Sequence, residues 1–213
     1  RYALGLDVVE AAVDHLDEQG LIDRTRVGMG GLSFGSEVTM WTVTHSNLLK
    51  AAAIASTSIG PAYYWFNERP SRKMFADNLR RNWRLGSPDS DPGAWKHMSP
   101  AAKIDRIRAP VLMQLPESEA RQTIELQSKL ATAQMGEMHI FPLAPHIKFE
   151  PRQKLAVYQR NLDWFLYWLK GEVDADPAKS AQYARWSRLA PPGRNASTDR
   201  AQSSQSAISS SRK

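Results

Sequence analysis

Residues 30–35 read Gly-Gly-Leu-Ser-Phe-Gly, which brackets Ser33 with glycines two positions before and two positions after it. Residues 26–29 before this stretch are predicted to form a short buried strand, and the residues from Ser36 onward follow a helical pattern. A serine between a strand and a helix lies on a turn so sharp that only glycines are expected to fit at both bracketing positions. Such a turn raises the hydroxyl clear of the backbone. The sequence therefore favours a nucleophilic serine over a simple tight turn.

Length and composition limit the class of protein. The chain has 213 residues, of which 42% are hydrophobic, and this is enough for one sizeable core. It has no run of about 18 apolar residues, so no membrane span is expected. The absence of cysteine excludes disulfides, metal–thiolate sites and a cysteine nucleophile, and no cofactor or metal is expected. The composition leaves the redox compartment open.

The formal charge of +6 does not indicate a nucleic-acid partner, because the basic residues are scattered. The one basic cluster, Arg80 and Arg81 with Arg84, is predicted to be a solvated helix face. Part of the excess positive charge lies after Gly171, outside the expected core.

Strand-like and helical patterns alternate along the chain, which predicts an α/β fold with a parallel sheet covered by helices on both faces. Residues 1–189 are expected to form this α/β domain, and residues 190–213, which are rich in serine, glutamine and alanine, a disordered tail. The expected strands are 26–29, 51–56, 110–115 and 138–141, the expected helices are 4–19, 36–46, 122–134 and 152–169, and 60–102 is expected to be an insertion of short helices.

Apolar residues at helical spacing mark an apolar face on each of the two long helices. In the first helix this face includes Val8 and Leu16, and in the last helix it includes Tyr158, Leu162 and Phe165.

A nucleophilic serine needs a base to take its proton, and the base needs a carboxylate to orient it. In α/β-hydrolases these residues follow in the order serine, acid, histidine, each on a loop after a strand. His146 follows the last predicted strand and is the candidate base. Glu117 and Glu119 both follow the third strand, and this pattern does not choose between them. The other histidines are expected to be packed or surface residues: His15, His45, His97 and His139.

Three motifs make residues 5–171 resemble the catalytic domain of the prolyl oligopeptidase family of serine peptidases. They are Arg-Val-Gly at 26–28 before the serine motif, Ser-Pro at 99–100 before Ala-Pro-Val-Leu at 109–112, and Phe-Pro at 141–142 before His146. The resemblance implies an α/β-hydrolase fold and a metal-independent peptidase. It also implies that this chain is the C-terminal portion of a larger protein, whose N-terminal β-propeller and first sheet strands lie outside it.

The resemblance also suggests which glutamate is the acid. The family pattern His-Gly-x-x-Asp-x-Arg-Val, laid over residues 115–122, puts Glu119 on the aspartate and Arg121 on the arginine, with Glu117 in reserve. This chain departs from the pattern, because Leu-Pro replaces His-Gly and glutamate replaces aspartate. Ser36 also stands where a second glycine often follows the serine motif.

Further candidate site residues lie next to the serine, in the insertion and in the acid loop. The backbone N–H of Phe34, next to the nucleophile, is the expected oxyanion donor. The family places aromatic pocket walls about thirty residues after the serine, where this chain has Tyr63, Tyr64 and Trp65. Arg121 is expected either to bind a substrate carboxylate or to form a salt bridge within its loop.

The departures in the acid loop, together with residues 176–186, resemble the lasso peptide isopeptidases within this family. Enzymes of that branch hydrolyse the isopeptide bond between an N-terminal amine and an aspartate or glutamate side chain in a threaded peptide. The expected partner is therefore a peptide substrate. Two alternatives are a general dipeptidyl or acylaminoacyl peptidase and a non-catalytic peptide-binding module.

Overall fold

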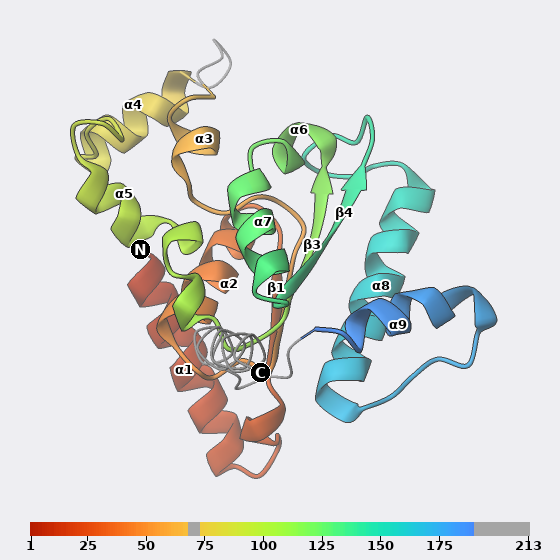
Figure 1. Cartoon of the computed structure of the whole chain (residues 1–213). Helices are drawn as coiled ribbons and strands as arrows, with labels where there is room; N and C mark the ends of the chain where they lie inside the picture. The colour runs from red at the N-terminus through yellow and green to blue at the C-terminus, as the bar shows by residue number, and fades with distance from the viewer. Residues whose placement is uncertain (68–72, 190–213) are drawn as a thin grey trace, which may run out of the picture.

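A four-stranded parallel sheet in the order β1-β2-β3-β4 forms the centre of the structure (Figure 1). The structure is a computed structural model that describes residues 1–67 and 73–189. The strands are β1 (Gly28–Gly31), β2 (Ala51–Ile54), β3 (Val111–Pro116) and β4 (Gly136–Phe141). The expected parallel α/β architecture is confirmed, and the predicted tail at 190–213 lies outside the described residues.

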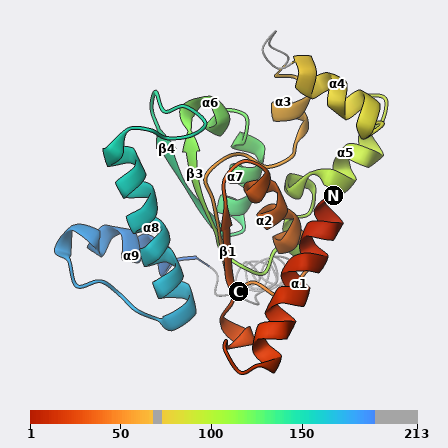
Figure 2. The same cartoon turned by 180° about the vertical axis from the view of Figure 1, so that it is seen from behind.

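Helices cover both faces of this sheet, as Figures 1 and 2 show. On one face lie α2 (Phe34–His45) and α7 (Ile124–Thr132), with α1 (Tyr2–Glu18) packed on α2. On the other face lie α8 (Pro151–Lys170) and α9 (Ser180–Trp186). Gly171 ends α8 in the left-handed conformation, as its position predicts. None of the helices described here has the length and apolar character needed to cross a bilayer.

The predicted insertion forms three short helices, α3 (Pro61–Tyr64), α4 (Lys73–Asn82) and α5 (Pro92–Met98). They gather beside α1 and α2, on the side away from α8 and α9 (Figures 1 and 2). A separate apolar cluster that includes Leu79 and Trp95 holds this group together. The remaining short elements are α6 (Glu117–Ala120) and the 3₁₀ turns η1 (Arg24–Arg26), η3 (Pro100–Ala102), η4 (Ile104–Arg106) and η5 (Pro177–Lys179).

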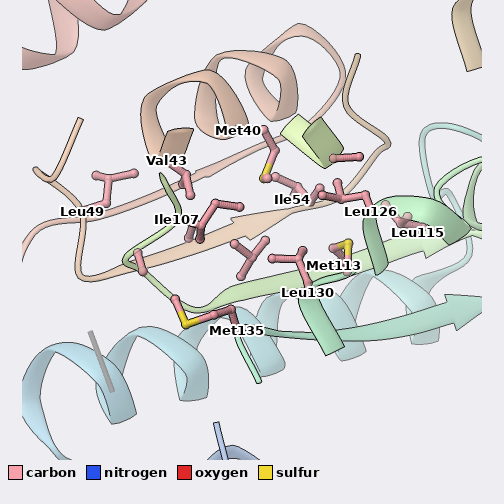
Figure 3. Close-up of a cluster of buried hydrophobic side chains, with 14 of the residues drawn as sticks. Met40, Val43, Leu49, Ile54, Ile107, Met113, Leu115, Leu126, Leu130 and Met135 are labelled. Carbon is pink, nitrogen blue, oxygen red and sulfur yellow. The ribbon is translucent and has the colours of Figure 1, made fainter. Parts of the chain in front are cut away.

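Alternation along the strands divides the core into two layers. Ile54 of β2 and Met113 of β3 point toward α2 and α7, where they meet Met40 and Leu130 (Figure 3). Ala51 and Ala53 of β2 and Leu112 of β3 face the opposite layer. In this layer Trp164 of α8 and Trp186 of α9 are fully buried. These two rings pack edge to face with centroids 5.0 Å apart.

The apolar faces expected for the two long helices are wrong in part. In α1, Leu6 and Val13 are buried whereas Val8 is exposed. In α8, Trp164 is buried, whereas Tyr158 and Leu162 are 65% and 61% exposed. Both helices carry apolar residues on more than one side, so the neighbouring element decides which side becomes buried.

Candidate active site

Ser33 lies at the sharp turn between β1 and α2. It adopts φ 57° and ψ −126°, a conformation that non-glycine residues rarely adopt, and its side chain is exposed. Backbone strain of this kind persists only where the surrounding structure enforces it, and it is common at functional sites. The strand–serine–helix geometry expected from the sequence is therefore present.

The two glycines that bracket Ser33 have different roles. A Cβ added to Gly31 would overlap the backbone carbonyl group of Gly35 and lie 2.7 Å from the Ser36 nitrogen. A Cβ added to Gly35 would meet nothing within 4 Å. The expectation that both positions require glycine is therefore wrong for Gly35, because only Gly31 lies in the path of the returning chain.

A buried chain of hydroxyl groups holds the backbone of this turn. The Ser33 N–H donates to Ser56 Oγ at 2.7 Å, the Ser56 hydroxyl donates to Ser36 Oγ at 2.9 Å, and the Ser36 hydroxyl donates to the Gly31 carbonyl at 2.7 Å. Ser36 and Ser56 are almost completely buried. Ser36 thus connects the two sides of the turn.

Replacing Ser56 with alanine is expected to lower the free energy of unfolding by about 1–3 kcal/mol, because the Ser33 N–H loses its acceptor. Chemical denaturation of the wild type and the variant measures the difference. Thr42→Val is the matched control, since the buried Thr42 hydroxyl has no hydrogen-bond partner in the described part of the chain. An equal loss of stability in both variants would contradict the role given to Ser56.

Glu119 and His146 lie 27 residues apart and meet beyond the carboxyl ends of the neighbouring strands β3 and β4. Glu119 belongs to α6, the short helix that directly follows β3 in Figure 1. Glu119 is 5% exposed. Its Oε1 lies 2.6 Å from His146 Nδ1, and its Oε2 accepts the Thr57 N–H at 3.0 Å. Thr123 adds hydrogen bonds to the Glu119 carbonyl and to the Thr57 hydroxyl. Both carboxylate oxygens are therefore engaged, one by the imidazole and the other by backbone.

Glu117 and Arg121 form an ion pair with each other on the outside of α6. Arg121 is 76% exposed and lines a small pocket separate from the one that contains Ser33. Of the two roles considered for Arg121, the structure shows the salt bridge within its loop.

Ser33 and His146 line the same open cavity of about 730 Å³. Tyr63 and Tyr64 form part of its wall, whereas Trp65 packs against Trp95 with ring centroids 6.1 Å apart. The remaining lining residues come from α2, from the loop after β2 and from α4: Glu37, Ser56, Thr57, Met74, Asp77, Asn78, Arg81 and Asn82.

The N–H of Phe34, at the first position of α2, makes no hydrogen bond to any residue that the structure describes. It thus remains available to an oxygen atom bound next to Ser33. Over residues 1–67 and 73–189, no three histidine or acidic side chains are grouped so that they could hold a metal ion.

Two features of the site were missed by sequence reasoning. Lys148 is buried two residues after His146, and its Nζ donates to the Ala55 carbonyl at 3.3 Å. Burial lowers the pKa of Lys148, and the charge of Glu119 opposes this shift. The polar residues Ser56 and Thr57 could have been found from their place after a buried strand, where ligand sites of parallel sheets form. No comparable signal marks Lys148.

The chain is similar to known proteins in both sequence and structure. Residues 6–172 match the Prolyl oligopeptidase family (Peptidase_S9). The lasso peptide isopeptidase AtxE2 of Asticcacaulis excentricus is 32% identical over 188 residues, which are 86% of this chain and 26% of that protein.

Two solved structures of AtxE2 also match. The structure without ligand superposes with a TM-score of 0.77 at 30% identity, over 85% of this chain and 28% of that one. A serine-to-alanine variant with Astexin3-dC4 bound superposes with a TM-score of 0.74 at 29% identity, over the same shares of the two chains. The chain thus spans about a quarter of the length of the relative that it matches.

Proposed function

The chain belongs to the prolyl oligopeptidase family of serine peptidases, and on this basis we propose that it cleaves the isopeptide bond of a lasso peptide through Ser33, His146 and Glu119. The observation that carries the proposal is the 2.6 Å contact between Glu119 and His146 beside the cavity that Ser33 lines. The likeness to AtxE2 supports the isopeptide bond as the target, since that enzyme is a lasso peptide isopeptidase.

The proposed reaction is acyl transfer in two steps. His146 takes the proton of Ser33 Oγ as the oxygen attacks the isopeptide carbonyl, and then gives it to the leaving amine. Glu119 holds the imidazole in the required tautomer and stabilises its protonated form. Water then attacks the acyl-enzyme by the same route, which releases the side-chain carboxylate of the substrate and restores Ser33. The Phe34 N–H donates to the oxyanion in both steps.

The proposal extends to the longer protein. Among the strands described, β1 pairs with β2 on one side only, and the site contains one identified oxyanion donor. We propose that the functional protein adds further strands next to β1, whose loop supplies the second donor, and an N-terminal β-propeller. Experiments on activity therefore use the full-length parent protein.

Three kinds of substrate test the proposed activity of the full-length protein. They are a threaded lasso peptide, its unthreaded, branched-ring form and unrelated linear dipeptidyl substrates. Hydrolysis adds one water to the peptide and opens its ring, and mass spectrometry detects both changes. We expect the threaded peptide to be opened and unrelated linear dipeptidyl substrates to be left intact. Equal hydrolysis of the linear substrates would instead favour a general peptidase.

Labelling with a fluorophosphonate separates catalysis from simple peptide binding. The reagent is expected to modify Ser33 in the full-length protein and to leave the Ser33→Ala variant unmodified. Failure to label the folded wild-type protein would favour the non-catalytic peptide-binding module.

A further inference from the structure

One face of α4 forms a wall of the cavity that contains Ser33 and His146. The five α4 residues that line the cavity recur at intervals of three and four, which puts them on the same side of the helix. They are Met74, Asp77, Asn78, Arg81 and Asn82. The prediction that Arg81 belongs to a solvated surface cluster is therefore incomplete, because Arg81 also faces the site.

The charged groups of this wall differ in their partners. The Asp77 carboxylate accepts a hydrogen bond from Lys73 Nζ at 2.8 Å, and this bond, together with the nearby charges of Lys73, Arg81 and Arg80, lowers the pKa of Asp77. Glu37, on α2, accepts a hydrogen bond from the Tyr2 hydroxyl at 2.7 Å. The Arg81 guanidinium forms neither a hydrogen bond nor an ion pair with any residue in the described ranges. Of the described residues that line the cavity, Arg81 is therefore the cation whose donors remain free.

Neighbouring arginines provide a contrast. Arg80 lies over the Trp65 ring at 4.8 Å and has Asp77 at 3.8 Å, and it does not line the cavity. Arg121, the other candidate for binding a substrate carboxylate, pairs with Glu117 away from the cavity. Among the arginines that the structure describes, Arg81 is thus the one that combines a place in the wall with uncommitted donors.

We propose that Arg81 selects peptide substrates that carry a carboxylate close to the bond being cleaved. A guanidinium binds a carboxylate through two parallel hydrogen bonds, and such charge-assisted bonds are stronger than those between neutral groups. The inference rests on the proposed function in one respect, that the peptide occupies the cavity of Ser33. Asn78 and Asn82 lie beside Arg81, and the Asn82 side-chain amide donates a hydrogen bond to Asn78 Oδ1. The Asn82 side-chain oxygen and the remaining amide hydrogens are available to the peptide backbone.

The carboxylate could belong to an acidic side chain or to the C-terminus, so the experiment uses three peptides. One contains aspartate and has an amidated C-terminus, the second has asparagine in its place, and the third is the asparagine peptide with a free C-terminus. Isothermal titration calorimetry on full-length Ser33→Ala protein measures binding without hydrolysis. A failure of catalysis therefore does not obscure the result.

Arg81→Gln is expected to weaken binding of a carboxylate-bearing peptide by about 10-fold or more and to leave the asparagine amide peptide unchanged. Arg81→Lys should restore part of the affinity, since the charge remains but the paired geometry is lost. The matched control, Arg80→Gln, should change none of the three affinities. The peptide whose affinity falls identifies the source of the carboxylate.

Equal weakening of all three peptides by Arg81→Gln would overturn the proposal, as would unchanged affinities or the same effect from Arg80→Gln. The proposal would also be overturned if none of the three peptides bound. Because Arg81 is exposed, its replacement is not expected to prevent folding, and a thermal unfolding curve for each variant verifies this.

Discussion

Replacing Glu119 with glutamine is expected to lower kcat of the full-length protein by about 10,000-fold. The glutamine amide has nearly the same shape but no charge, so it neither stabilises a protonated His146 nor holds the imidazole in the required tautomer. The 2.6 Å contact with Nδ1 makes this effect specific to Glu119. Steady-state hydrolysis of the lasso peptide by the wild type and the variant measures it.

Glu117→Gln is the matched control, since Glu117 lies two residues away in the same short helix. Its carboxylate pairs with the exposed Arg121 and not with His146. Exposed ion pairs of this kind contribute about 0–1 kcal/mol to stability, so kcat and folding should stay close to wild type. A larger loss of kcat in Glu117→Gln than in Glu119→Gln would reverse the assignment of the acid.

Replacing Gly31 with alanine is expected to lower the free energy of unfolding by about 3 kcal/mol or more, at the upper end of the range for overpacking. The added methyl group would overlap the backbone of Gly35, which cannot move aside as a flexible side chain could. Because β1 and the Ser33 turn would have to shift together, covalent labelling of Ser33 should also fall. Denaturant unfolding and the fluorophosphonate reaction measure the two effects.

Gly35→Ala tests the same motif at a position with open space. Gly35 has no positive φ and lies in the first turn of α2, so alanine should be neutral or should stabilise the fold by less than about 1 kcal/mol. A loss of stability as large as that of Gly31→Ala would mean that the bracketing glycines are equivalent, contrary to the geometry of the turn.

The sequence was sufficient for features that depend on neighbours along the chain. The pattern of short apolar runs and amphipathic segments predicted the parallel α/β architecture, and Ser33 was correctly placed between a strand and a helix. The motif could not distinguish Gly31 from Gly35, since the approach of one backbone segment to another is a tertiary contact. The buried faces of α1 and α8 were predicted wrongly in part for the same reason.

The same distinction between local sequence and tertiary contacts applies to the candidate site. The residues alone supplied His146 and left Glu117 and Glu119 open, and the family resemblance favoured Glu119 without showing a contact. In the structure the end of β3 turns Glu119 inward to His146 and the Thr57 N–H, while Glu117 turns outward to Arg121. Residues two positions apart thus have opposite surroundings.

By itself, the sequence determined the order of strands and helices along the chain, the sharp turn at Ser33 and the family. These depend on periodicity, glycine placement and motif spacing, which act over a few residues. Only the tertiary structure decided that Glu119 meets His146, that Ser36 and Ser56 hold the Ser33 backbone, and that Arg81 faces the cavity. The physical reason is that these contacts join loops and helices 20 or more residues apart, so they exist only once the sheet has brought its strand ends together.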